Sequence, residues 1–286
     1  MQMTCAWKEL LSVLPAWLRM EVDLQDPGSL LEIRMRLHTP PELVTKEGSR
    51  GLERKIAQED LHYTINAASR YSPWTAVSAA QGFLTILGGH RIGLCGDAVV
   101  QQGVVTGIRN VSSLCIRVAK DFPGIAAGIP RHSGSVLILG PPGWGKTTLL
   151  RDLIRQWEEA ERICVVDERG ELFPEGLSRG KRVDVLSGCP KGQGIPMLLR
   201  TMGPSCIAVD EITAREDAET LLQAAKCGVR LLATAHARSL SDFRQRNVYQ
   251  PLVINRIFET FLVLKEDKTF TMERMTEWVT SGLVQY

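Results

Sequence analysis

A short stretch of glycine, lysine and threonine near the middle of the chain has the spacing of a phosphate-binding loop. Gly140, Gly145, Lys146 and Thr147 occupy the fixed positions of the P-loop motif, between an apolar run and a helical pattern. Successive backbone N–H groups in such a loop point inward, and the following helix adds its partial positive charge. The alternative is a glycine turn that matches by chance, and the flanking strand and helix argue against it. The sequence therefore predicts a site for the phosphates of a nucleotide.

Each position of this loop has an expected task. Lys146 would reach the β- and γ-phosphates, and the Thr147 hydroxyl would ligate Mg²⁺. Glycines allow positive φ and close approach of the backbone to the ligand. The expected cofactors are ATP and Mg²⁺. The predicted nucleotide-binding residues are Gly140, Pro141, Pro142, Gly143, Trp144, Gly145, Lys146, Thr147 and Thr148.

Carboxylates follow two apolar runs downstream of the loop. Asp210 and Glu211 follow the run 206–209, and Asp167 and Glu168 follow the run 163–166. The ends of parallel strands face the ligand crevice of an open α/β sheet. Asp210 fits an acid of the Mg²⁺ shell, and Glu211 fits the base that polarises the attacking water. The alternative for this pair is a solvated acidic turn.

The earlier acidic pair allows two interpretations. Asp167 and Glu168 could hold the network of metal-bound water, which would make Asp167 part of the metal site and Glu168 a catalytic residue. They could equally cap a loop, with Arg169 as an exposed ion partner.

A histidine follows a third apolar run. Thr234 and His236 lie at the end of the run 229–234, where His236 could sense the γ-phosphate. A structural histidine is the alternative.

Arginines from the first part of the chain are candidates for a further catalytic role. Developing charge on a transferred phosphoryl group is often met by an arginine that is delivered from elsewhere. Arg117 precedes a predicted linker, which suits such a contact. The alternative is a set of surface arginines. The candidates are Arg91, Arg109 and Arg117.

Composition restricts the class of protein. The chain has 286 residues, of which 44% are hydrophobic and 23% are charged, as expected of a globular protein with one large or two ordinary domains. A net charge of +2 argues for neither a nucleic-acid binder nor an acidic-surface binder and excludes neither. No pair of the seven cysteines has Cys-x-x-Cys spacing, so no zinc site is expected. No apolar run approaches the ~18 residues of a membrane span, and no signal-peptide core is present.

Residues 1–127 are predicted to form a smaller α+β domain. Apolar residues have helical spacing up to 18, with a break at Pro15, and helices are expected at 58–69 and 75–81. The GxxG sequence of Gly93–Gly96 is compatible with an RNA-binding loop, but it is interpreted as a hairpin end. A linker is expected at 120–128. Strands are predicted at 30–37, 42–44, 82–87, 90–95, 104–108 and 114–118.

Residues 128–286 alternate strands with helices, as a parallel sheet requires. Helices are predicted at 147–159, around 198–200 and at 214–227. Strands are predicted at 136–139, 162–166, 183–186, 206–209, 229–234 and 255–264. The fold class is therefore α/β with a parallel-rich sheet, preceded by the α+β domain.

The order of these motifs resembles the secretion ATPases of type II and type IV systems. Their Walker A, Asp box, Walker B and His box correspond to residues 140–147, 167–171, 208–211 and 233–236. The chain is similar over its whole length to the stage III sporulation protein AA family, through residues 32–36, 88–96 and 108–117. The resemblance departs at the Asp box, where Glu-Asp-Pro is usual and Asp167-Glu168-Arg169 stands here. The roles of Asp167 and Glu168 therefore stay open.

The resemblance implies a RecA-like P-loop ATPase domain behind the smaller domain, assembled as a homohexamer. It implies ATP hydrolysis that energises a channel between mother cell and forespore, with membrane-embedded channel proteins as partners. The protein would be cytoplasmic, on the mother-cell side, and peripheral to the membrane. N-terminal arginines complete a neighbour's active site in secretion ATPases, which favours Arg91, Arg109 and Arg117.

Two functions remain open from sequence. The first is a Mg²⁺-dependent ATPase that converts hydrolysis into domain motion for a channel or transport complex. The alternative is an ATP-driven nucleic-acid motor with the same RecA-like core, motivated by the GxxG sequence, although nucleic acid is not an expected partner. A GTPase is disfavoured because the chain has no Asn-Lys-x-Asp motif.

Overall fold

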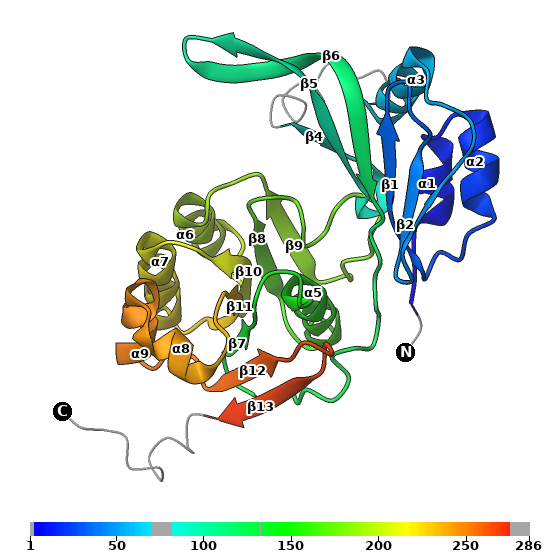
Figure 1. The fold of residues 1–286 in the computed structure, drawn as a ribbon. Helices are drawn as coiled ribbons and strands as arrows, with labels where there is room; N and C mark the ends of the chain where they lie inside the picture. The colour runs from blue at the N-terminus through cyan, green and yellow to red at the C-terminus, as the bar shows by residue number, and fades with distance from the viewer. Residues whose placement is uncertain (1–2, 70–81, 132, 275–286) are drawn as a thin grey trace. The chain divides into compact units, whose positions relative to one another are not determined.

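The computed structural model describes residues 3–69, 82–131 and 133–274. This part of the chain divides into two compact units (Figure 1). One unit holds Met3–Asp121 together with Pro174–Leu177, and the other holds Phe122–Phe173 and the described residues from Ser178 onward. Residues 122–127, expected at the end of the first domain, thus belong to the second unit. The helix predicted at 75–81 lies outside the described residues.

The N-terminal unit is built on an antiparallel sheet. Within the described residues, six strands run in the order β3-β2-β1-β6-β5-β4. Along β1, Ile33 and Met35 are buried while Arg34 between them is only half-buried, the alternation of a sheet with one apolar face. The strands are β1 (Leu30–Arg36), β2 (Glu42–Thr45), β3 (Ser49–Gly51), β4 (Phe83–Thr85), β5 (Arg91–Gln101) and β6 (Val104–Arg117).

Helices cover the apolar face of this sheet. They are α1 (Trp7–Ser12), α2 (Ala16–Asp23) and α3 (Gln58–Ser69). Pro15 lies at the N-cap of α2 and separates it from α1, as its missing N–H and fixed φ predict. The apolar residues of these helices pack with those of the sheet in one cluster that includes Leu10, Leu18, Leu61 and Ile33. The predicted α3 boundaries are confirmed.

The prediction of separate strands at 104–108 and 114–118 was wrong. Residues 104–117 form one continuous strand, β6, which pairs with β5 along its length. A bulge interrupts the ladder between Cys95 and Asp97, where a Cβ on Gly96 would lie 2.6 Å from the Arg109 carbonyl oxygen. Gly93–Gly96 thus lies inside β5 and is neither a hairpin end nor a loop. The loop geometry that motivated a nucleic-acid motor is absent at these described residues.

His90 connects distant parts of the N-terminal unit. Its fully buried ring contacts the Ala6 carbonyl oxygen through Nε2 at 2.9 Å and accepts a hydrogen bond from the Ala119 N–H at Nδ1. Nδ1 accepts, so the neutral ring carries its proton on Nε2 and donates it to Ala6. Burial lowers the pKa of His90 below its ordinary value of 6.5.

The lowered pKa of His90 predicts acid sensitivity of the fold. The unfolded chain binds a proton near its ordinary pKa, whereas the folded chain resists it, so the contribution to stability is present above pH 6.5 and is lost as the pH falls through the folded pKa. Urea unfolding at about pH 7.5 and about pH 5.5 measures this loss. His90→Gln is expected to show a smaller loss than the wild type. Equal losses in both proteins would contradict this assignment.

The second unit is built on a mostly parallel sheet. Within the described residues, seven strands run in the order β13-β12-β7-β11-β10-β8-β9, and β13 pairs antiparallel with β12. Central β7 is buried at every position, as expected of a strand covered on both faces. The strands are β7 (Val136–Leu139), β8 (Ile163–Asp167), β9 (Val183–Ser187), β10 (Cys206–Ile212), β11 (Arg230–Ala235), β12 (Thr260–Leu264) and β13 (Phe270–Arg274).

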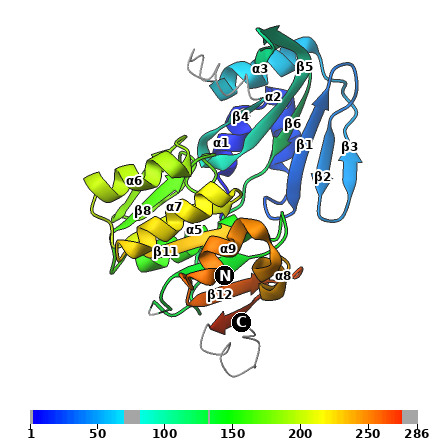
Figure 2. The same ribbon diagram turned by 90° about the vertical axis from the view of Figure 1, so that its left-hand side faces the viewer.

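Helices lie on both faces of this sheet. One face packs on α5 (Lys146–Trp157), through side chains that include Leu149, Leu153 and Trp157. The helices that pack on the other face are α6 (Lys191–Thr201), α7 (Arg215–Lys226), α8 (Leu240–Gln245) and α9 (Gln250–Ile254), and α7 lies in front of the sheet in Figure 2. The parallel-rich α/β class predicted from the sequence is confirmed.

The last part of the second unit was predicted as a strand with its approach over 255–264, and it holds two further elements. Strand β12 begins only at Thr260, and helix α9 and the edge strand β13 flank it. Strand β13 is short, largely exposed and mostly polar, which gives a weak strand signal. Among the described residues, no helix has both the length and the apolar character required to cross a membrane.

Candidate nucleotide site

The predicted phosphate-binding loop joins β7 to α5. Gly143 and Gly145 have φ values of 76° and 98°, a region that residues with side chains disfavour. Gly145 is the N-cap of α5, so the loop ends at the free N–H groups of a helix. This geometry can bind an anion through backbone groups and the helix dipole.

Lys146 is buried at the start of α5. Its Nζ donates a hydrogen bond to the Pro141 carbonyl oxygen at 2.9 Å and lies 3.0 Å from His236 Nδ1. Burial lowers the pKa of Lys146, and the carboxylates of Asp210 and Glu211 oppose that shift. A partly desolvated ammonium with few anionic contacts is suited to bind incoming phosphate oxygens.

Asp210 is held by hydroxyl groups from two elements. Thr147 Oγ1 donates to Asp210 Oδ2 at 2.7 Å, and Thr234 Oγ1 donates to Asp210 Oδ1 at 2.6 Å. The fully buried Thr234 hydroxyl also accepts the Glu211 N–H at 2.8 Å. Thr234 therefore positions both acidic residues through one hydroxyl group.

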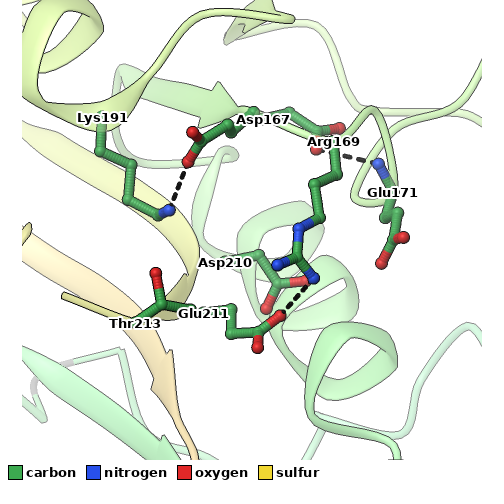
Figure 3. Close-up of a pocket in the computed structure, with 8 residues that line it drawn as sticks. Asp167, Arg169, Glu171, Lys191, Asp210, Glu211 and Thr213 are labelled. Carbon is green, nitrogen blue, oxygen red and sulfur yellow. Dashed lines mark hydrogen bonds and ion pairs between the residues drawn. The ribbon is translucent and has the colours of Figure 1, made fainter. Parts of the chain in front are cut away.

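A distortion of β10 brings Asp210 and Glu211 to the same cavity. Consecutive side chains in a regular strand point to opposite faces. Here the pairing with β11 shifts register between Val209 and Ile212, and Glu211 has a φ of 53°. Both carboxylates consequently line one cavity (Figure 3). Such backbone strain is often found at functional sites.

Glu211 has a partner at each carboxylate oxygen. His236 Nε2 lies 2.7 Å from Oε1, and Arg169 Nη1 donates to Oε2 at 2.8 Å. The Lys146 ammonium can only donate, so His236 Nδ1 accepts and the Nε2 proton points at Glu211. A continuous chain of hydrogen bonds thus connects Lys146, His236, Glu211 and Arg169.

Asp167 shapes the loop that follows β8. Its carboxylate is 1% exposed and accepts hydrogen bonds from the N–H groups of Glu171 and Leu172, each at 2.9 Å, and of Phe173 at 3.0 Å. Arg151 of α5 donates to the carbonyl oxygens of Leu172 and Glu171 in the same loop. These contacts favour a role in shaping the loop over the predicted role in the metal site.

Glu168 is paired with Lys191, a residue that the sequence analysis did not identify. Lys191 Nζ lies 2.6 Å from Glu168 Oε2 and 3.7 Å from Asp217 Oδ2, and the residue is 4% exposed. Lys191 is the first residue of α6 and belongs to no recognisable motif. Its burial between two acids appears only once the ends of β8, α6 and α7 are brought together.

Two cavities of the second unit bear on the site. One of about 160 Å³ is lined by the acids at the ends of β8 and β10, with Arg169 and Lys191 reaching into it (Figure 3). The other, of about 470 Å³, is largely apolar and suits a nucleobase. Trp144 of the predicted loop lines it, whereas its other apolar residues had no motif to mark them. They include Phe122, Ile125, Leu149, Leu264 and Phe270.

The oxygen ligands at the loop fit Mg²⁺. Among the described residues, no group of three or more His, Cys, Asp or Glu side chains could hold a metal ion. Mg²⁺ typically uses one or two protein oxygens and completes its shell with water and substrate phosphates. The Thr147 hydroxyl and the Asp210 carboxylate, 2.7 Å apart, form such a pair of hard ligands.

The candidate arginines all lie in the N-terminal unit. The Arg91 guanidinium lies 3.7 Å from the centre of the Phe83 ring, and Arg117 is 71% exposed and 3.7 Å from Glu32. Arg109 lies opposite Asp97 in the β5–β6 pair. Their contribution to a nucleotide site stays a prediction.

Comparisons with known proteins show what the chain is similar to. The family profile described as "Sporulation stage III, protein AA" matches residues 7–274. Stage III sporulation protein AA of Bacillus subtilis (strain 168) is 35% identical over 280 residues, which cover 91% of each chain. Type II secretion system protein E of Dickeya dadantii (strain 3937) is 32% identical over 112 residues, or 39% of this chain and 22% of that protein.

Solved structures show the same fold at low identity. The pilus retraction motor PilT with bound ADP has a TM-score of 0.62 at 17% identity, over 92% of this chain and 81% of that one. The Legionella pneumophila ATPase DotB has a TM-score of 0.59 at 17% identity, over 91% and 80%. The fold is thus a RecA-like P-loop α/β unit preceded by a smaller α+β unit. On its match to the family profile and to the Bacillus subtilis relative, the chain belongs to the sporulation stage III protein AA family.

Proposed function

We propose that the protein is a Mg²⁺-dependent ATPase that hydrolyses ATP to ADP and phosphate. One observation carries the proposal. The hydrogen-bond chain from Lys146 through His236 to Glu211 joins a phosphate-binding loop to a carboxylate that can take a proton from water. A site that only bound nucleotide would not require an aligned base beside the loop.

Each side chain of the site has a task in this proposal. Lys146 and the loop N–H groups bind the phosphates, while Thr147 and Asp210 hold Mg²⁺, which neutralises phosphate charge. Glu211 accepts the proton of the attacking water, and His236 holds the Glu211 carboxylate in place. Thr234 fixes Asp210 and the Glu211 backbone. The apolar cavity beside Trp144 takes the base.

The proposed biological role is that of a homohexameric motor for a channel between mother cell and forespore. Membership of the family and the likeness to a pilus retraction motor and a type II secretion protein support it. Its partners would be membrane-embedded channel proteins, and the protein would be cytoplasmic on the mother-cell side. Arg91, Arg109 and Arg117 would complete the site of a neighbouring copy.

Metal removal tests the proposed chemistry. Phosphate release from ATP is expected to fall to background with EDTA and to return when Mg²⁺ is added in excess, because the Thr147–Asp210 pair acts through the ion. Light scattering with ATP and Mg²⁺, on protein in which Glu211→Gln slows turnover, measures the expected hexamer. Release that is indifferent to EDTA would contradict the metal dependence, and a strict monomer would contradict the motor.

A further inference from the structure

The two cations that line the acidic cavity differ in how firmly they are held. Lys191 is 4% exposed and lies between the carboxylates of Glu168 and Asp217. The Arg169 side chain is 60% exposed, and its one ion pair within the described residues is with Glu211. Figure 3 shows Arg169 extending across the cavity toward Asp210 and Glu211. Arg169 can therefore leave its partner at much lower cost than Lys191.

The Arg169 contact occupies the second oxygen of the carboxylate that the proposed hydrolysis needs. Glu211 Oε1 faces His236, and Glu211 Oε2 accepts from Arg169. A carboxylate that takes a proton from water needs an oxygen that is open to that water. His236 is anchored on Lys146, so Arg169 is the partner whose departure opens the base.

Charge gives a reason for Arg169 to move. The cavity is lined by acids, among them Glu168, Glu171 and Glu211, and Lys191 is already committed to two carboxylates. A terminal phosphate held by Lys146 would face the Lys146–His236–Glu211 chain, and the exposed Arg169 side chain would reach it on leaving Glu211. A guanidinium binds a phosphate through paired hydrogen bonds, and a phosphate dianion competes well with one carboxylate.

We propose that Arg169 distinguishes a nucleoside triphosphate from a diphosphate by exchanging Glu211 for the γ-phosphate. This exchange frees Glu211 only when the triphosphate is bound, so it couples recognition of ATP to exposure of the base. The inference rests on the proposed ATPase function. Arg169 stands where the Asp box of the secretion ATPases that the chain resembles has proline.

Binding measurements without turnover test the exchange. Calorimetry with Mg²⁺ gives Kd values for ADP and for AMP-PNP, a triphosphate analogue that resists hydrolysis. Arg169→Gln is expected to weaken AMP-PNP binding about tenfold and to leave ADP binding within about twofold, because a charge-assisted contact to the γ-phosphate is lost. Arg169→Lys is expected to recover part of the AMP-PNP affinity. Arg215→Gln is the matched control, since Arg215 is 65% exposed and paired with Glu219 at 2.9 Å.

The outcomes separate this inference from the proposed function. Equal weakening of AMP-PNP binding and ADP binding in the Arg169→Gln variant would show a merely structural role for Arg169. Unchanged Kd values would show that Arg169 has no role in nucleotide binding. Either result overturns the inference. A wild-type protein that binds both nucleotides without hydrolysing ATP refutes the ATPase proposal and leaves the Arg169 test valid. A wild type that binds neither nucleotide overturns both.

Discussion

Glu211→Gln is expected to lower the ATP turnover number about a thousandfold and to leave the Kd for ATP within about threefold. The amide has the size of the carboxylate but cannot take a proton from water. It can still accept the His236 Nε2 proton through its oxygen, so the Lys146–His236 contact and the loop are preserved. Binding therefore survives while the chemical step fails.

Steady-state phosphate release and calorimetric binding measure the two effects separately. Glu216→Gln is the matched control, because Glu216 is an exposed acid on α7. Its turnover is expected to equal that of the wild type. Substantial hydrolysis by the Glu211 variant would remove Glu211 as the base and would direct attention to Glu168 at the same cavity.

Lys146→Ala is expected to weaken ATP binding at least about a hundredfold. The Lys146 ammonium is the cation of the predicted phosphate-binding loop, and its burial would allow strong contacts with phosphate oxygens. Truncation also leaves His236 Nδ1 without its donor, which loosens the chain that holds Glu211. Turnover should therefore fall together with binding.

The stability of the Lys146 variant should change little in the absence of nucleotide. The lowered pKa of Lys146 shows that burial of this ammonium opposes its charged form, so its removal relieves a cost of desolvation. Calorimetry and thermal unfolding together make the test. Lys181→Ala, at an exposed site, is the control for both measurements. Unchanged ATP affinity in the Lys146 variant would refute the phosphate-binding assignment.

Helix α5 links the phosphate loop to other parts of its unit. Arg151 donates to carbonyl oxygens of the loop after β8, and Asp152 accepts the N–H groups of Gly124 and Ala126 at 3.0 and 2.8 Å. The second contact explains why residues 122–127 belong to the second unit, although their glycine and proline content predicted a linker. Arg151 and Asp152, which are adjacent in α5, thus hold two loops against this helix.

Local patterns predicted most of the elements, and the failures have physical causes. Strand β7 and helix α3 have the predicted boundaries. The pattern that marks each of them, a continuous apolar run in β7 and apolar residues at helical spacing in α3, lies wholly within the element. Strand β6 was divided in the prediction because Arg109–Ser113 interrupts its apolar pattern. Pairing with β5 and β1 supplies the backbone hydrogen bonds that make it continuous. Strand β13 needed β12 as its partner.

The sequence by itself predicted a phosphate-binding loop followed by acidic and histidine-bearing strand ends, since fixed residue types at short spacing define such motifs. The tertiary structure alone determined which contacts these residues make with one another. It placed the Thr234 hydroxyl between Asp210 and the Glu211 backbone. It also paired Lys191 with Glu168 and Arg169 with Glu211. These contacts join residues 23 to 42 positions apart. No local pattern records them, because they depend on the order of strands in the sheet and on the distortion that turns Glu211 toward Asp210.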